Sequence, residues 1–313
     1  DESEPAHSRG AGRPEASAAQ PASAAATHSP SAAPAPHKPD THPASRSKGV
    51  DPEASVPGVA ATVWLNRALP DPTPPSLRLT PAYAANLLAT ARRAGADWAL
   101  VLGVLRADGN RAQAPARPAT IAETAARLRN VGKDGEAWSA ALAITGRTAM
   151  SDRAVALSRY YRAIGIDALV NGLRAEQRSL AGAVLADRRV DIYAGGRADI
   201  EKGRIDVRVI ALISYLAESY GQVTVSSLFS GHRLYARPGV VSAHIYGHAI
   251  DIAALGNVSI AGHQEPGSVT EHAVRDILLL PAEMRPRQVI SLLGMGGPSF
   301  PLANHDDHIH VGY

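Results

Sequence analysis

The stretch Ser242-Ala-His-Ile-Tyr-Gly-His-Ala-Ile-Asp251 decides how the C-terminal part of this chain folds. Residues alternate from 249 to 255 as they do in a β-strand, with isoleucines on one face and Asp251 on the other. A turn at Gly247 can bring His244 back beside that strand. A carboxylate that faces an apolar layer is costly unless it is paired or binds a metal. We therefore expect Asp251 to have a partner, with His244 as the nearest candidate.

A second stretch, His305-Asp-Asp-His-Ile-His310, lies close to the C-terminus. His308 and His310 are two residues apart on an expected strand, so they share one face and can enter the same site. Two histidines with one aspartate form a ligand set of the catalytic zinc type, which leaves a fourth position for water. The two stretches together predict a metal site.

The distribution of histidine supports this region as the place of the chemistry. The chain has 12 histidines, of which four lie in the first 42 residues and eight lie between 232 and 310. Histidine is the commonest neutral-pH metal ligand and proton shuttle, so the cluster predicts a functional site. We expect four of the eight to be surface or loop histidines, namely His248, His263, His272 and His305.

The pattern S-x-H-x-x-G-x-A-x-D, followed by D-H-x-H, resembles the zinc D,D-carboxypeptidase and L,D-/D,D-endopeptidase superfamily. That superfamily includes D-Ala-D-Ala dipeptidases, phage endolysin peptidases and the hedgehog amino-terminal signalling domain. The matching positions are Ser242, His244, Gly247, Ala249, Asp251, Asp307, His308 and His310. The resemblance covers roughly residues 190–313, and it implies that His244, Asp251 and His310 bind zinc. No base partner follows Ser242 in a triad arrangement, so we expect this serine to cap the turn and not to act as a nucleophile.

The resemblance further implies three catalytic residues. Asp307 corresponds to the acidic general base, with Asp306 as its possible substitute, and His308 to the residue that hydrogen-bonds the water or the developing oxyanion. Arg233 corresponds to the arginine that stabilises the substrate carbonyl or carboxylate. His232 stands where the family has an aromatic residue, which is a departure from its pattern.

The remainder of the chain divides by composition. Residues 1–57 contain 33 Pro, Ala and Ser residues, and such a segment cannot bury enough apolar surface to fold, so we predict a disordered tether. Residues 58–190 read as a helical accessory domain, with Ala- and Leu-rich periodic stretches at Ala82–Leu105, Thr120–Ala143 and Arg153–Ala186.

One helical stretch, Trp98–Gly109, is faintly similar to the catalytic helix of lysozyme-like lytic transglycosylases. Ala107 stands where that family has its catalytic glutamate, and Asp108 follows it. We therefore expect a degenerate accessory domain, with a glycan-cleaving enzyme as a further alternative.

Residues 191–313 predict an α+β domain, with a small antiparallel sheet and flanking helices. A buried helix is expected at Ile205–Tyr220, and a capping box that begins at Ser268 opens a second helix through Leu280. The expected strands are Gln222–Ser227, Ala249–Leu255, Gln288–Leu293 and His308–Tyr313.

The amino-acid composition excludes several classes of function. Cysteine is absent, so there is no disulfide and no thiolate metal site or nucleophile. The net charge of +3 over 313 residues gives no basic footprint for nucleic acid. No run of 18 apolar residues occurs, so we expect no membrane span. Because the first residue is Asp1, we expect any signal peptide to have been removed.

These observations predict a secreted or cell-wall-associated bacterial zinc metallopeptidase that acts on peptidoglycan peptides. The substrate class follows from the resemblance alone. The alternative is a non-catalytic, wall-associated module in which zinc is structural, as in the hedgehog domain. The bond cleaved, the choice between carboxypeptidase and endopeptidase, and the oligomeric state stay open.

Overall fold

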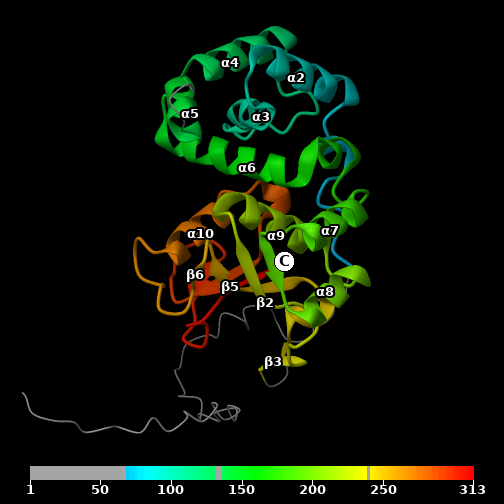
Figure 1. Cartoon of the computed structure of the whole chain (residues 1–313), viewed down its shortest axis with the longest axis vertical. Coiled ribbons are helices and arrows are strands. Elements are labelled where there is room, and N and C mark those ends of the chain that lie inside the picture. Colours follow the sequence, from blue (N-terminus) through cyan, green and yellow to red (C-terminus); the bar gives the residue numbers. More distant parts are fainter. Residues whose placement is uncertain (1–67, 132–135, 238–239) are drawn as a thin grey trace, which may run out of the picture. The chain divides into compact units, whose positions relative to one another are not determined.

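The computed structural model describes residues 68–131, 136–237 and 240–313. The predicted tether at 1–57 lies outside the described residues. The described chain is α+β, as expected, with helices first and a mixed sheet with further helices after them (Figure 1).

The three predicted helical stretches are present, and each is divided into two helices. After the 3-10 turn η2 (Pro75–Leu77), the helices are α2 (Pro81–Ala94), α3 (Trp98–Arg106), α4 (Pro118–Val131), α5 (Ala137–Thr145), α6 (Thr148–Asn171) and α7 (Gln177–Ala186). Asp97 separates the first pair, because its side chain accepts a hydrogen bond from Ala99 N and so begins a new helix. Gly172 ends α6 before α7 begins, and Gly165 kinks α6 with φ 78°.

Helix α3 lies inside the helical region, with α2, α4, α5 and α6 around it (Figure 1). Its sequence is almost entirely apolar, and six of its nine residues are buried while the other three are half-buried, which explains why it needs helices on several sides. Gly103 brings α3 close to α6, since a Cβ at this position would lie 2.4 Å from the Ala154 carbonyl oxygen. The transglycosylase-like stretch is therefore a core helix.

The sheet has the strand order β1-β2-β5-β9-β7-β8, and β6 pairs with β5. The strands are β1 (Val190–Ile192), β2 (Val223–Ser227), β5 (Ala249–Leu255), β6 (Val258–Ser259), β7 (Gln288–Ser291), β8 (Ser299–Pro301) and β9 (Ile309–Gly312). A separate two-stranded ribbon pairs β3 (Tyr235–Arg237) with β4 (Val240–Val241).

The expected antiparallel sheet occupies the centre, β2-β5-β9-β7, and a parallel strand is added at each edge. The parallel pairing of β1 with β2 follows from the connection between them, because α8 (Ala194–Glu201) and α9 (Val207–Tyr220) return the chain to the same end of the sheet. The sheet is consequently mixed and not purely antiparallel.

Helix α9 joins the helical region to the sheet. It lies between α6 and the strands in Figure 1, and ten of its fourteen residues are buried. A helix that is apolar on all sides needs partners on all sides, so one apolar core continues from Leu69 to Tyr313. The chain changes from helices to sheet at Val190, close to the predicted boundary, and the division into two domains at residues 190 and 191 stays a prediction.

The last long helix, α10 (Val269–Leu278), begins at the predicted cap. Ser268 accepts a hydrogen bond from Glu271 N, and the Glu271 carboxylate accepts one from the backbone N–H of Gly267, the residue before the cap. Within the residues described here, no helix is both long and apolar enough to cross a membrane.

Candidate metal centre

The first predicted stretch forms a short turn followed by a central strand. Ser242 caps the 3-10 turn η4 (Ala243–Tyr246) by accepting a hydrogen bond from His244 N (3.3 Å), as expected for a capping residue. Gly247 ends the turn with φ 69°, and its carbonyl oxygen accepts a hydrogen bond from Asp206 N (2.9 Å). A Cβ at Gly247 would lie 1.9 Å from the Arg204 carbonyl oxygen, so this turn requires glycine.

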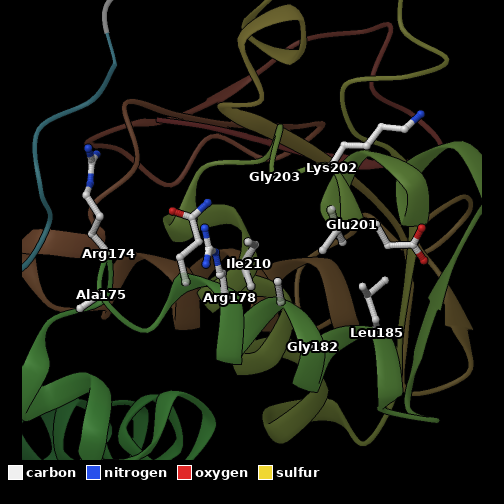
Figure 2. Close-up of a pocket in the computed structure, with 12 residues that line it drawn as sticks. Arg174, Ala175, Arg178, Gly182, Leu185, Glu201, Lys202, Gly203 and Ile210 are labelled. Carbon is white, nitrogen blue, oxygen red and sulfur yellow. The ribbon is translucent and has the colours of Figure 1, made fainter.

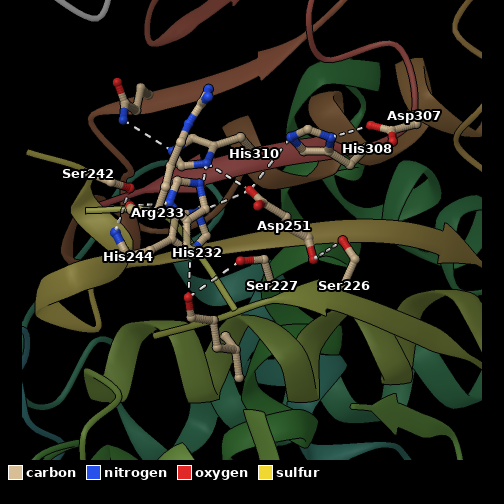
Figure 3. Close-up of polar contacts among 12 residues, drawn as sticks. Ser226, Ser227, His232, Arg233, Ser242, His244, Asp251, Asp307, His308 and His310 are labelled. Atoms are coloured by element: carbon tan, nitrogen blue, oxygen red, sulfur yellow. Dashed lines mark hydrogen bonds and ion pairs between the residues drawn. The ribbon is translucent and has the colours of Figure 1, made fainter. Parts of the chain in front are cut away.

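Three donor atoms from distant parts of the chain converge here. Asp251 on β5 and His310 on β9 are direct cross-strand partners, and η4 brings His244 to them. His310 Nδ1 lies 2.8 Å from Asp251 Oδ1, and His244 Nε2 lies 3.1 Å from that oxygen and 3.2 Å from His310 Nδ1. The three predicted metal ligands therefore meet, although they span residues 244–310 (Figure 3).

Neighbouring groups orient both rings. The Nδ1–H of His244 donates to the Leu228 carbonyl oxygen (2.9 Å), so Nε2 is the ring nitrogen that faces Asp251. The side-chain amide of Gln288 hydrogen-bonds His310 Nε2 (3.2 Å), so Nδ1 is the atom that faces the other donors. Such outer partners are what hold the ring of a metal-binding histidine in place.

The charge states of the site suit a cation. Burial alone would raise the pKa of Asp251, but hydrogen bonds from His244 and His310 outweigh it and hold that pKa well below its usual range. Burial lowers the pKa of His310, which favours the neutral imidazole that a metal ligand must be. An ionised carboxylate beside a neutral imidazole nitrogen fits a divalent metal, so these residues could hold one.

His232 is a further donor near the same place. Single ligand atoms of His232, His244 and Asp251 all lie within 4.8 Å of one another, so these three residues could also hold a metal ion. The His232 ring lies parallel to the His244 ring, with an interplanar angle of 8° and centroids 4.2 Å apart. Because coplanar rings at that separation would clash, the two rings are stacked. The lone pair of an imidazole nitrogen lies in the plane of its ring, so an ion in the plane of His244 lies outside the plane of His232. His310 is therefore better oriented than His232 to be the third ligand.

Of the predicted catalytic residues, His308 lies nearest to these donors, and it connects Asp307 to them. His308 stands between two carboxylates, with Nδ1 2.5 Å from Asp307 Oδ1 and Nε2 3.8 Å from Asp251 Oδ1 (Figure 3). Asp307 is 71% exposed at its side chain, so it can reach a molecule in solvent. Arg233 is exposed and follows His232, the residue stacked on His244.

Two histidines that we expected at the surface are buried. His305 packs against His308 and His310, with ring centroids 4.6 and 5.9 Å apart, and burial lowers its pKa to about 3. His248 is buried beside η4, and its Nδ1 has no hydrogen-bond partner among the described residues. The burial of His305 had one signal in the sequence, since this residue lies three positions before His308 in a histidine-rich segment. His263 and His272 are exposed, as expected.

Two cavities elsewhere in the described residues have no such cluster of metal-ligand atoms. A cavity of about 850 Å³ lies along α7, α8 and α9, and Figure 2 shows Arg174 and Lys202 at opposite ends of it. A cavity of about 20 Å³ lies at the end of α3, and its lining includes Glu283, which is paired with Arg111 (2.5 Å). The second cavity is too small for a glycan.

Comparison of the chain with protein-family models, with curated proteins and with solved structures finds no match.

Proposed function

We propose that this chain is a secreted, zinc-dependent peptidase that hydrolyses amide bonds in the stem peptides or crosslinks of peptidoglycan. The observation that carries the proposal is the convergence of His244 Nε2, Asp251 Oδ1 and His310 Nδ1 within 3.2 Å of one another. Two imidazole nitrogens and one carboxylate oxygen form a zinc set that leaves a coordination position for substrate. The substrate class, the bacterial origin and the location outside the cell rest on the family resemblance of these residues.

The surrounding side chains supply the remaining chemistry. Zinc, when bound, supplies Lewis-acid polarisation of a substrate carbonyl. Asp307 takes a proton from the attacking water and returns it to the leaving amine, and its exposure allows both transfers. His308 hydrogen-bonds Asp307 and is near enough to Asp251 to contact the developing oxyanion. Arg233 stabilises the carbonyl or carboxylate of the substrate.

One observation favours a second candidate, a wall-associated module in which zinc is structural. His232 lies close enough to His244 and Asp251 to be a further donor. Four protein ligands would close the coordination sphere, as structural zinc sites do. The parallel stacking of His232 on His244 argues for the open, catalytic arrangement.

Digestion of purified peptidoglycan tests the proposal. The protein is incubated with peptidoglycan, with and without a chelator, and the products are identified by mass spectrometry. We expect new peptide termini that disappear with chelator and return with added zinc. A protein that binds one zinc per chain and yields no new termini would support the structural module.

Two substitutions separate the assigned roles. His310→Ala should lose zinc, because it removes one of three converging donors. Asp307→Ala should keep zinc and lose activity by a factor of about 10²–10⁴, the usual contribution of general acid–base catalysis. His272→Ala is the matched control, since this histidine is exposed on α10. Loss of zinc from Asp307→Ala would show that the ligand assignment is wrong. Full activity of Asp307→Ala would show that Asp307 is not the general base, and Asp306 or His308 would become the next candidate.

A further inference from the structure

The segment Leu228–Arg233, called here the site loop, carries two residues of the candidate site. His232 stacks on His244, and Arg233 follows it. The first residue of the loop also touches the site, because the Leu228 carbonyl oxygen accepts the hydrogen bond from His244 Nδ1. The position of this loop therefore sets both a face of His244 and the place of Arg233.

A buried carboxylate on α8 holds the middle of the site loop. Asp199 is 1% exposed, and its two oxygens accept hydrogen bonds from Ser230 N (2.6 Å) and Ser230 Oγ (2.7 Å). Arg204 lies 3.6 Å from Asp199 and partly balances its charge. A carboxylate is seldom buried this deeply unless hydrogen bonds or an opposite charge compensate for its lost hydration.

Tyr193, the residue that precedes α8, holds the loop at two more points. Its hydroxyl accepts a hydrogen bond from Leu228 N (2.9 Å) and donates one to the Ser230 carbonyl oxygen. Together, Tyr193 and Asp199 therefore engage the backbone of the loop on both sides of Phe229.

Two glycines at the start of α8 make this close packing possible. A Cβ at Gly195 would lie 2.9 Å from the Tyr193 ring and 3.2 Å from Ser230 Cβ. A Cβ at Gly196 would lie 2.7 Å from the same ring. The sequence Tyr193-Ala-Gly-Gly thus leaves room for the loop to lie directly on the tyrosine.

We propose that Asp199 and Tyr193 are positioning residues, which fix the site loop so that His232 and Arg233 meet the substrate beside the metal centre. Neither residue touches the three converging donors. Their effect should therefore fall on substrate binding more than on metal binding. The kinetic part of this inference rests on the proposed peptidase function, whereas the structural part does not.

The test compares Asp199→Asn and Tyr193→Phe with the unmodified chain. Glu201→Gln is the matched control, because Glu201 is an exposed carboxylate on the same helix. With zinc in excess, zinc per chain should stay unchanged in all four proteins, because none of the substitutions removes a proposed ligand atom. The value of kcat/KM should fall by about 10- to 100-fold in the two loop variants, mainly through a higher KM, and should not change in the control.

Limited digestion with trypsin gives a readout that needs no peptidase activity. Arg233 is a trypsin site within the loop, whereas Arg237 precedes Pro238 and resists cleavage. Releasing the loop should speed cleavage after Arg233 by about tenfold, since local opening exposes it, while cleavage at other arginines should not change. If Asp199→Asn fails to fold, Ser230→Ala, which removes only the hydroxyl contact, replaces it.

The outcomes separate this inference from the proposed function. If cleavage speeds up equally at all arginines, the variants are generally destabilised and the positioning role is wrong. If the rate of cleavage after Arg233 does not change, the positioning role is also wrong. If the unmodified protein cleaves no peptide, the proposed function fails, and selective cleavage after Arg233 still decides whether the residues position the loop.

Discussion

Gly247→Ala tests whether the turn that carries His244 is held as tightly as the structure indicates. The residue has φ 69°, and an alanine Cβ would lie 1.9 Å from the Arg204 carbonyl oxygen. Real Cβ atoms are essentially never found under 3.0 Å, so the two backbones must separate by 3.0 − 1.9 = 1.1 Å. Movement of that size would also strain the hydrogen bond from Asp206 N to Gly247 O.

Two costs add in this variant. A non-glycine residue in the left-handed region costs about 1–2 kcal/mol. Forcing apart a packed contact costs a further ~1–3 kcal/mol. The sum is about 2–5 kcal/mol, which lowers the unfolding midpoint by roughly 5–15 °C for a chain of this size. Because Gly247 N donates to the His244 carbonyl oxygen, we also expect zinc affinity to fall by about 10- to 100-fold.

Gly262→Ala is the matched control for this prediction. Gly262 has φ 79° and nothing within 4 Å of an added Cβ, so its replacement carries the backbone cost without the clash. Thermal unfolding by calorimetry and zinc affinity by chelator competition are measured for both variants. The reasoning is refuted if Gly247→Ala unfolds at the same temperature as Gly262→Ala and keeps the zinc affinity of the unmodified chain.

Two further predictions concern stability. Burial raises the pKa of Asp276 above its ordinary value of 3.8, despite the hydrogen bond from Tyr220. The contribution of this carboxyl to folding stability is therefore complete below pH 3.8 and is lost as the pH rises through the pKa of the folded state. The stability of Asp276→Asn relative to the unmodified chain should therefore be greater at pH 7 than at pH 4, as measured by urea unfolding, and a difference independent of pH would contradict this. Gly103→Ala should destabilise the chain by about 1–3 kcal/mol, because its Cβ would lie 2.4 Å from the Ala154 carbonyl oxygen. Gly182→Ala, in a helix with nothing within 4 Å, should instead be neutral or stabilising by up to about 1 kcal/mol, and equal effects of the two in thermal unfolding would contradict the assigned packing.

Features that depend on short range could be predicted from the sequence alone. The alternation around Asp251 placed it on a strand, and the serine before Glu271 marked the start of α10, because strand periodicity and helix caps involve residues a few positions apart. The turn at Gly247 was likewise predictable, since only glycine adopts its conformation without strain. The candidate metal ligands could also be predicted, but their assignment came from a resemblance to a known spacing pattern and not from local physics.

Features that depend on contacts between distant segments were decided by the tertiary structure. The parallel strands β1 and β8 are too short to show periodicity, and they form only because the sheet offers an edge to each. His305 and His248 look like loop histidines in the sequence, but packing against the site and against η4 buries them.

The same holds for the support of the site. Nothing near Asp199 or Tyr193 in the sequence marks either residue, because their hydrogen-bond partners in the site loop lie at least 31 positions away. A hydrogen bond to a buried carboxylate is formed only when the chain closes on itself and excludes water from both groups. The sequence by itself thus indicated which residues carry the proposed chemistry, and tertiary packing decided which residues hold them in position.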